Sequence, residues 1–133
     1  MHKNMSASEL PSPAEYKAKH PLSDKAKAVI DSSRRAIQDI LEGKDERLLV
    51  LVGPCSIHDP QGSDMEYARR LADILPRFSD KLFLVMRTYV EKPRSTTGWD
   101  GFVSAPRLNS DFDFAEGLAQ ARQFLRAVLE LGV

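Results

Sequence analysis

The sequence predicts an α/β fold with a parallel sheet, and two observations support this prediction. Two short runs, at residues 47–53 and 82–88, are apolar throughout, as is typical of parallel strands covered on both faces. A helical pattern lies between them, and strand–helix–strand order favours parallel pairing of the two strands. With 133 residues, the chain is long enough for one small domain with a hydrophobic core.

The elements before the first strand differ in regularity. Residues 1–22 contain three prolines and little periodicity, so we expect an irregular N-terminal arm. Residues 23–43 are predicted to be helical, because apolar residues recur on one face, Ser23 can cap the start and Gly43 can end the helix.

Two further helices are expected after the first strand. Asp59 and Pro60 suit the N-cap and first turn of the next helix, and Pro76 ends or kinks it. The last helix is expected to open at Asp113 and to run to Leu131. Between the second strand and this helix lies a long polar loop, and such loops are often functional.

Composition narrows the classes of function. Lys plus Arg number 19 and Asp plus Glu number 19, and this zero net charge argues against a nucleic-acid or anionic-membrane surface. No apolar run approaches the roughly 20 residues of a membrane helix, and the N-terminus lacks the apolar core of a signal peptide. The single cysteine cannot form an internal disulfide, so we expect a soluble cytoplasmic protein.

Cys55 follows the first apolar run, where the ligand sites of parallel sheets lie. From position alone, a lone cysteine is either a small buried hydrophobe, a metal ligand or a nucleophile. His58 lies three residues further on, but one cysteine and one histidine make a poor metal signature, and His58 suits a helix cap better.

Arg87 stands near the end of the second apolar run, where an unpaired charge is costly to bury. Its anionic partner is either an acidic side chain or a ligand carboxylate or phosphate. Residues 92–96 follow on the loop, with two cations, two hydroxyls and a stiffening proline. This set suits a phosphate ester, although a solvated loop has the same composition.

Two stretches resemble the class I 3-deoxy-D-arabino-heptulosonate 7-phosphate (DAHP) synthases. They are GPCSIHDP at residues 53–60 and MRTYVEKPRSTTGWDGF at residues 86–102. The resemblance implies that residues 45–133 form the first, incomplete part of a (β/α)8 TIM barrel, preceded by a helical extension at residues 1–44. One departure is Ser95, which stands where the family usually has threonine.

The same resemblance implies an activity: condensation of phosphoenolpyruvate with erythrose 4-phosphate to DAHP and phosphate, the first step of the shikimate pathway. It also implies a divalent metal of the manganese, iron, cobalt or zinc type, and a homo-oligomer. The implied roles are metal ligand for Cys55, phosphoenolpyruvate binding for Arg87, catalysis and binding of both substrates for Lys92, and erythrose 4-phosphate binding for Pro93, Arg94, Ser95 and Thr96.

The short length of the chain leaves an alternative. A TIM barrel takes about 250 residues and eight strands, whereas this sequence predicts two strands. The family's other metal ligands come from later strands and match nothing here. We therefore expect the 133-residue chain alone to be inactive, and the alternative is a truncated, non-catalytic fragment that binds phosphate or another chain.

Overall fold

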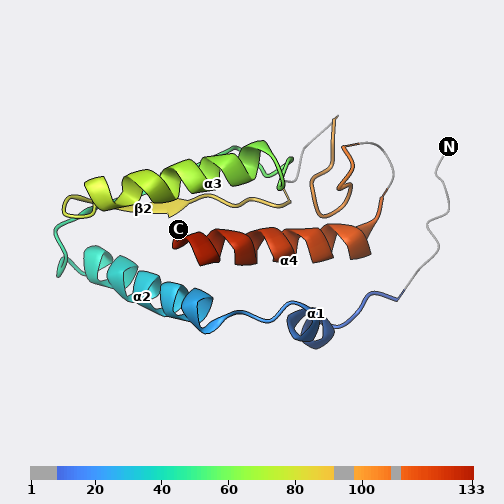
Figure 1. Cartoon of the computed structure of the whole chain (residues 1–133), viewed down its shortest axis with the longest axis horizontal. Helices are drawn as coiled ribbons and strands as arrows, with labels where there is room; N and C mark the ends of the chain where they lie inside the picture. The colour runs from blue at the N-terminus through green and yellow to red at the C-terminus, as the bar shows by residue number, and fades with distance from the viewer. Residues whose placement is uncertain (1–8, 92–97, 109–111) are drawn as a thin grey trace.

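The computed structural model describes residues 9–91, 98–108 and 112–133 (Figure 1). The elements are, in chain order, α1 (Pro13–Lys19), α2 (Asp24–Leu41), β1 (Leu48–Val52), α3 (Ser63–Ile74), a 3-10 turn η1 (Leu75–Arg77), β2 (Leu82–Met86) and α4 (Phe114–Leu131). None of the helices in the described ranges is long and apolar enough to cross a membrane.

The two strands form a parallel sheet, as predicted. They pair in register from Leu48 opposite Leu82 to Val52 opposite Met86. The crossover between them is α3, so β1, α3 and β2 form the strand–helix–strand unit expected from the apolar pattern. Because the strands are parallel, both carboxyl ends lie at the same edge of the sheet.

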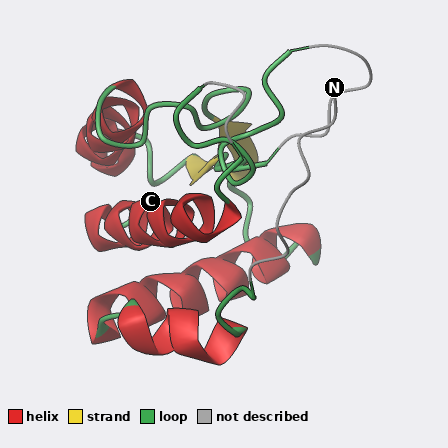
Figure 2. Ribbon diagram, turned by 90° about the vertical axis from the view of Figure 1, so that its right-hand side faces the viewer, coloured by secondary structure: helices red, strands yellow, loops and turns green. Residues whose placement is uncertain are grey.

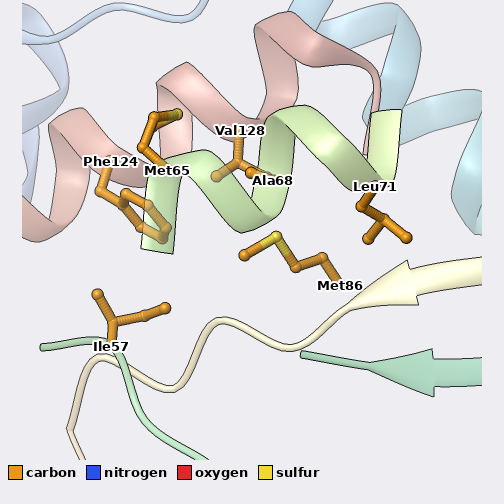
Figure 3. Packing of buried hydrophobic residues seen from close by; sticks show 7 residues of the cluster. All are labelled: Ile57, Met65, Ala68, Leu71, Met86, Phe124 and Val128. Atoms are coloured by element: carbon orange, nitrogen blue, oxygen red, sulfur yellow. The ribbon is translucent and has the colours of Figure 1, made fainter. Parts of the chain in front are cut away.

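The helices are stacked in a row beside the sheet. In Figure 1, α4 lies between α3 and α2, and both neighbours contact it. Figure 2 shows the same row turned by 90°, with the two yellow strands beside it. The core lies where α3, α4 and β2 meet, and Figure 3 shows its side chains pointing into one space: Ile57, Met65, Ala68, Leu71, Met86, Phe124 and Val128.

A short helix, α1, occupies part of the N-terminal arm that was predicted to be irregular. Its start is a capping box: the Ser12 hydroxyl accepts from the Glu15 amide at 3.3 Å, and the Glu15 carboxylate accepts from the Ser12 amide at 2.6 Å. The Ser12 amide also lowers the pKa of Glu15. The prediction was wrong because seven residues are too few to show a helical period, and Pro13 is tolerated in a first turn.

The beginning of α3 also differs from the prediction. The helix starts at Ser63 with Gly62 as N-cap, not at Asp59 and Pro60. Asp59 still caps, but from further away: its carboxylate accepts from the amides of Gly62 at 3.1 Å and Ser63 at 2.7 Å. Both hydrogen bonds lower the pKa of the Asp59 carboxyl, and the bond from the Ser63 amide has the larger effect.

The remaining helix boundaries follow the sequence closely. Ser23 caps α2 through the amide of Ala26, and Asp113 caps α4 through the amide of Glu116. At its other end α4 stops at Gly132, whose φ of 88° is left-handed and favours glycine. As expected, Pro76 marks the end of α3, inside the 3-10 turn.

Candidate functional site

The carboxyl ends of β1 and β2 approach each other so closely that a side chain at position 53 would be crowded. The Arg87 amide donates to the Val52 carbonyl at 2.7 Å. A Cβ on Gly53 would lie 3.1 Å from both the amide nitrogen and the carbonyl oxygen of Arg87, and Gly53 has a φ of 136°. Glycine at position 53 therefore lets the first loop (residues 53–62) leave the sheet directly beside Arg87.

Cys55 lies in this first loop and is exposed. This exposure contradicts the interpretation of Cys55 as a small buried hydrophobe. Among the described residues, no three His, Cys, Asp or Glu side chains are grouped so as to hold a metal ion. These residues therefore do not make a metal site by themselves, and a ligand role for Cys55 stays a prediction.

The first loop is held at two neighbouring points beyond Cys55. Ile57 is fully buried in the core, and its amide donates to the Tyr89 carbonyl at 2.8 Å. The next two amides, of His58 and Asp59, donate to one carboxylate oxygen of Asp64, at 2.8 and 2.7 Å. The loop is thereby fastened both to the chain that follows β2 and to α3.

Asp64 was missed by the sequence analysis. An acidic residue in the first turn of a helix is common, because it suits the helix dipole. Its spacing from His58 and Asp59 therefore carried no signal that the side chain turns back to the loop. Only the burial of the carboxylate, with 2% of the residue exposed, distinguishes it from an ordinary acidic residue of a first turn.

Arg87 is half-buried, and its guanidinium carbon lies 4.8 Å from the centroid of the Tyr89 ring. This distance suits a cation–π contact. Within the described part of the chain, Arg87 forms no ion pair with an acidic side chain. The described residues thus contain no acidic partner for Arg87, the partner that the sequence analysis set against a ligand.

Five predicted site residues lie outside the described residues: Lys92, Pro93, Arg94, Ser95 and Thr96. Their flanks belong to the second loop (residues 87–113). On these flanks, Glu91 and Gly101 form an antiparallel bridge. The Glu91 carboxylate accepts from the amides of Val103 at 2.9 Å and Ser104 at 3.1 Å, and from the Ser104 hydroxyl.

Further contacts fix the second loop to the body of the protein. Phe102 is buried with 1% exposed, and the Trp99 indole donates to the Ala105 carbonyl at 2.7 Å. A Cβ on Gly117 of α4 would lie 2.0 Å from the Val103 carbonyl oxygen. The loop backbone therefore rests directly on the α4 backbone, at a position that only glycine permits.

A cavity in the described part adjoins the start of the second loop, because its wall includes Thr88. It measures about 730 Å³ and opens between α2, β2 and α4. Its wall includes all five residues of β2, so it follows an edge of that strand rather than one face. The cavity therefore reaches the carboxyl end of β2, next to Arg87, whereas Cys55 is not part of its wall.

The chain is similar to known proteins over nearly its whole length. Residues 19–131 match the model of the DAHP synthetase I family. The Tyr-sensitive phospho-2-dehydro-3-deoxyheptonate aldolase of Escherichia coli K12 is 47% identical over 124 residues, which are 93% of this chain and 35% of that protein. The phospho-2-dehydro-3-deoxyheptonate aldolase of Corynebacterium glutamicum is 46% identical over 123 residues, 92% of this chain and 33% of that protein.

A solved structure shows the same arrangement. The phospho-2-dehydro-3-deoxyheptonate aldolase of Francisella tularensis SCHU S4 superposes with a TM-score of 0.89 and 37% identity, over 98% of this chain and 38% of that chain. The chain thus spans about a third of the length of the curated relatives that it matches.

Proposed function

The chain belongs to the DAHP synthetase I family, and on this basis we propose that it takes part in the condensation of phosphoenolpyruvate with erythrose 4-phosphate. The products are DAHP and phosphate, and the reaction is the first step of the shikimate pathway. The observation that carries the proposal is the junction of Gly53 and Arg87, which brings together the loops with both family motifs.

We propose that β1 and β2 are neighbouring strands of a (β/α)8 barrel, with residues 1–44 as an extension and residues 45–133 as the first part of the barrel. Parallel, in-register pairing across a helical crossover supports this proposal. The largely apolar cavity along the edge of β2 supports it too, because a further parallel strand would pair there. A homo-oligomer remains a prediction.

In this proposal each loop has its own task. Arg87 binds phosphoenolpyruvate, whose carboxylate and phosphate both suit a guanidinium fork. Lys92 lies between the two substrates. The residues assigned to erythrose 4-phosphate are Pro93, Arg94, Ser95 and Thr96.

The reaction is an aldol-like condensation. C3 of phosphoenolpyruvate attacks the aldehyde carbon of erythrose 4-phosphate, water adds at C2, and phosphate leaves with cleavage of the C2–oxygen bond. Lys92 protonates or stabilises the alkoxide that develops from the aldehyde oxygen. Cys55 is proposed as one ligand of a divalent metal, whose other ligands would come from residues beyond those described.

A chimera tests the proposal. Residues 1–133 replace the matched third of the E. coli K12 Tyr-sensitive enzyme, and the consumption of phosphoenolpyruvate is followed with erythrose 4-phosphate and manganese. We expect the chimera to turn over and the 133-residue chain alone to be inactive, since a barrel site needs eight strands. Turnover by the chain alone at about one per second, an ordinary enzyme rate, would contradict the barrel proposal.

Two substitutions in the chimera test the assigned residues. Arg87→Lys keeps the charge but loses the fork, so the KM for phosphoenolpyruvate should rise about tenfold or more. The matched control is Arg70→Lys, at an exposed arginine of α3 that pairs with Glu66, and it should leave KM unchanged. Cys55→Ser should lower the bound metal. Normal KM in the first variant, or undiminished metal in the last, would refute the corresponding role.

A further inference from the structure

We propose that Asp64 is a positioning residue, which fixes the first loop and thereby the position of Cys55 at the carboxyl end of β1. The importance of this position for the reaction rests on the proposed function. The fixation itself is a property of the 133-residue chain and can be measured without any turnover.

The Asp64 carboxylate is buried and bound by the loop. Only 2% of the residue is exposed, and Oδ2 accepts from the His58 amide at 2.8 Å and from the Asp59 amide at 2.7 Å. A buried carboxylate is unfavourable unless such donors reach it, and hydrogen bonds to a charged acceptor are stronger than neutral ones. The carboxylate and the two amides therefore hold one another in place.

Helix capping does not account for this carboxylate. The first amides of α3 already have an acceptor, because Asp59 accepts from Gly62 at 3.1 Å and from Ser63 at 2.7 Å. Asp64 lies inside the helix, as its second residue, and its side chain turns back to the loop instead. Its two amide bonds consequently order the loop and not the helix that carries it.

Cys55 lies midway between two fastened points. Three residues before it, the Val52 carbonyl accepts from the Arg87 amide at 2.7 Å. Three residues after it, the His58 amide is bound by Asp64, next to the buried Ile57. A segment this short with both ends fixed has few conformations. Without the Asp64 carboxylate, the second fastening would keep only the burial and amide bond of Ile57 and the longer bond, 3.2 Å, from the residue 64 amide to the Asp59 carbonyl.

The test uses the only cysteine of the chain. A nitroxide label on Cys55 reports the motion of the loop through its electron paramagnetic resonance line shape. In Asp64→Ala, we expect a narrower spectrum, with a rotational correlation time shortened by about twofold or more. The correlation time in Asp64→Asn should fall between those of the parent chain and of Asp64→Ala, because the side-chain amide oxygen of asparagine still accepts but carries no charge. Urea unfolding of each variant separates loop motion from loss of the fold.

Two matched controls distinguish the effect of the bonds between the Asp64 carboxylate and the two loop amides from other effects. Asp73→Asn removes an exposed carboxylate near the end of the same helix. His58→Ala removes the ring nitrogen that lies 3.7 Å from Asp64 but keeps the backbone amide. Both should give the parental spectrum. Equal narrowing in either control, or a parental spectrum in Asp64→Ala, would overturn the proposal.

If Asp64→Ala does not fold, two other measurements test the proposal. They are the nitroxide spectrum of Asp64→Asn and the amide hydrogen exchange of the unsubstituted chain. The His58 and Asp59 amides should then exchange more slowly than the backbone amide of Gln61, an exposed residue, and equal exchange would overturn the proposal. An inactive chimera with the expected spectra would refute the proposed function and leave the role of Asp64 intact.

Discussion

The two loops at the carboxyl end of the sheet are fastened in different ways. In the first loop, the acceptor is Asp64, which belongs to the helix that follows. In the second loop, the acceptor is Glu91, which belongs to the loop and binds its far side at Val103 and Ser104. The carboxylate that fixes the loop backbone thus comes from a neighbouring helix in the first loop and from within the loop in the second.

Their apolar anchors are alike in burial but not in size. Ile57 anchors the first loop and Phe102 the second, and both are almost completely buried. The longer loop has the larger anchor, as expected if more ordered residues require more buried surface to offset their lost entropy. The predictions below test whether this contrast holds.

The largest effect is expected for Phe102→Ala. Removal of the Phe102 ring should lower the free energy of unfolding by about 3–5 kcal/mol, because it leaves a cavity. Ile57→Ala should lower it by about 2–5 kcal/mol for the same reason. Urea unfolding measures both. Phe112→Ala is the control, because 48% of that residue is exposed and its ring only stacks on Phe114, so its removal should cost no more than about 0.5–1.5 kcal/mol. If Phe102→Ala cost no more than this control, the second loop would have no apolar anchor.

Gly117→Ala should have the next largest effect. In an open helix this change would stabilise by about 0.5–1 kcal/mol, but here the new methyl group would overlap the Val103 carbonyl. We expect overpacking to lower the free energy of unfolding by about 1–3 kcal/mol in total. Urea unfolding reveals the sign, and stabilisation would mean that the second loop moves away from α4 without cost.

Ser104→Ala tests the closure of the second loop on itself. The change removes the hydroxyl bond to Glu91 but keeps both amide bonds to that carboxylate. Because Glu91 is exposed, loss of this bond should cost about 1.5 kcal/mol, the low end for a charged acceptor. Ser79→Ala, at an exposed serine, is the matched control. Equal unfolding midpoints for the two variants would show that the amides alone close the loop.

The smallest effect concerns pH and the start of α3. The Ser63 amide lowers the pKa of Asp59 in the folded state, so its contribution to stability is present above the unfolded pKa of about 3.9 and is lost as the pH falls through the folded value. Unfolding midpoints of the parent chain should therefore decline more steeply below about pH 4 than those of Asp59→Asn. Parallel declines would show that this cap carries no pH dependence.

Much of the fold was predictable because it follows from local chemistry. Continuous apolar runs identified β1 and β2, and the caps at Ser23 and Asp113 identified the starts of two helices. The motifs around Cys55 and Arg87 were visible as well. The sequence failed at α1, which is too short to show a period, and at the start of α3, where Asp59 caps from a distance.

The sequence by itself thus determined the two strands and the three longer helices, their order, the family motifs and the strand ends at which Cys55 and Arg87 stand. Only the tertiary structure decided that Asp64 turns back to the first loop, that Glu91 closes the second, and that Gly117 admits the Val103 backbone. The physical reason is the separation of the contacting residues along the chain. Periodicity and capping depend on residues within about four positions of each other. The Asp64 bonds join residues 5 and 6 positions apart, across the turn into α3, and the Glu91 bonds join residues 12 and 13 positions apart, so both depend on how the loops fold back.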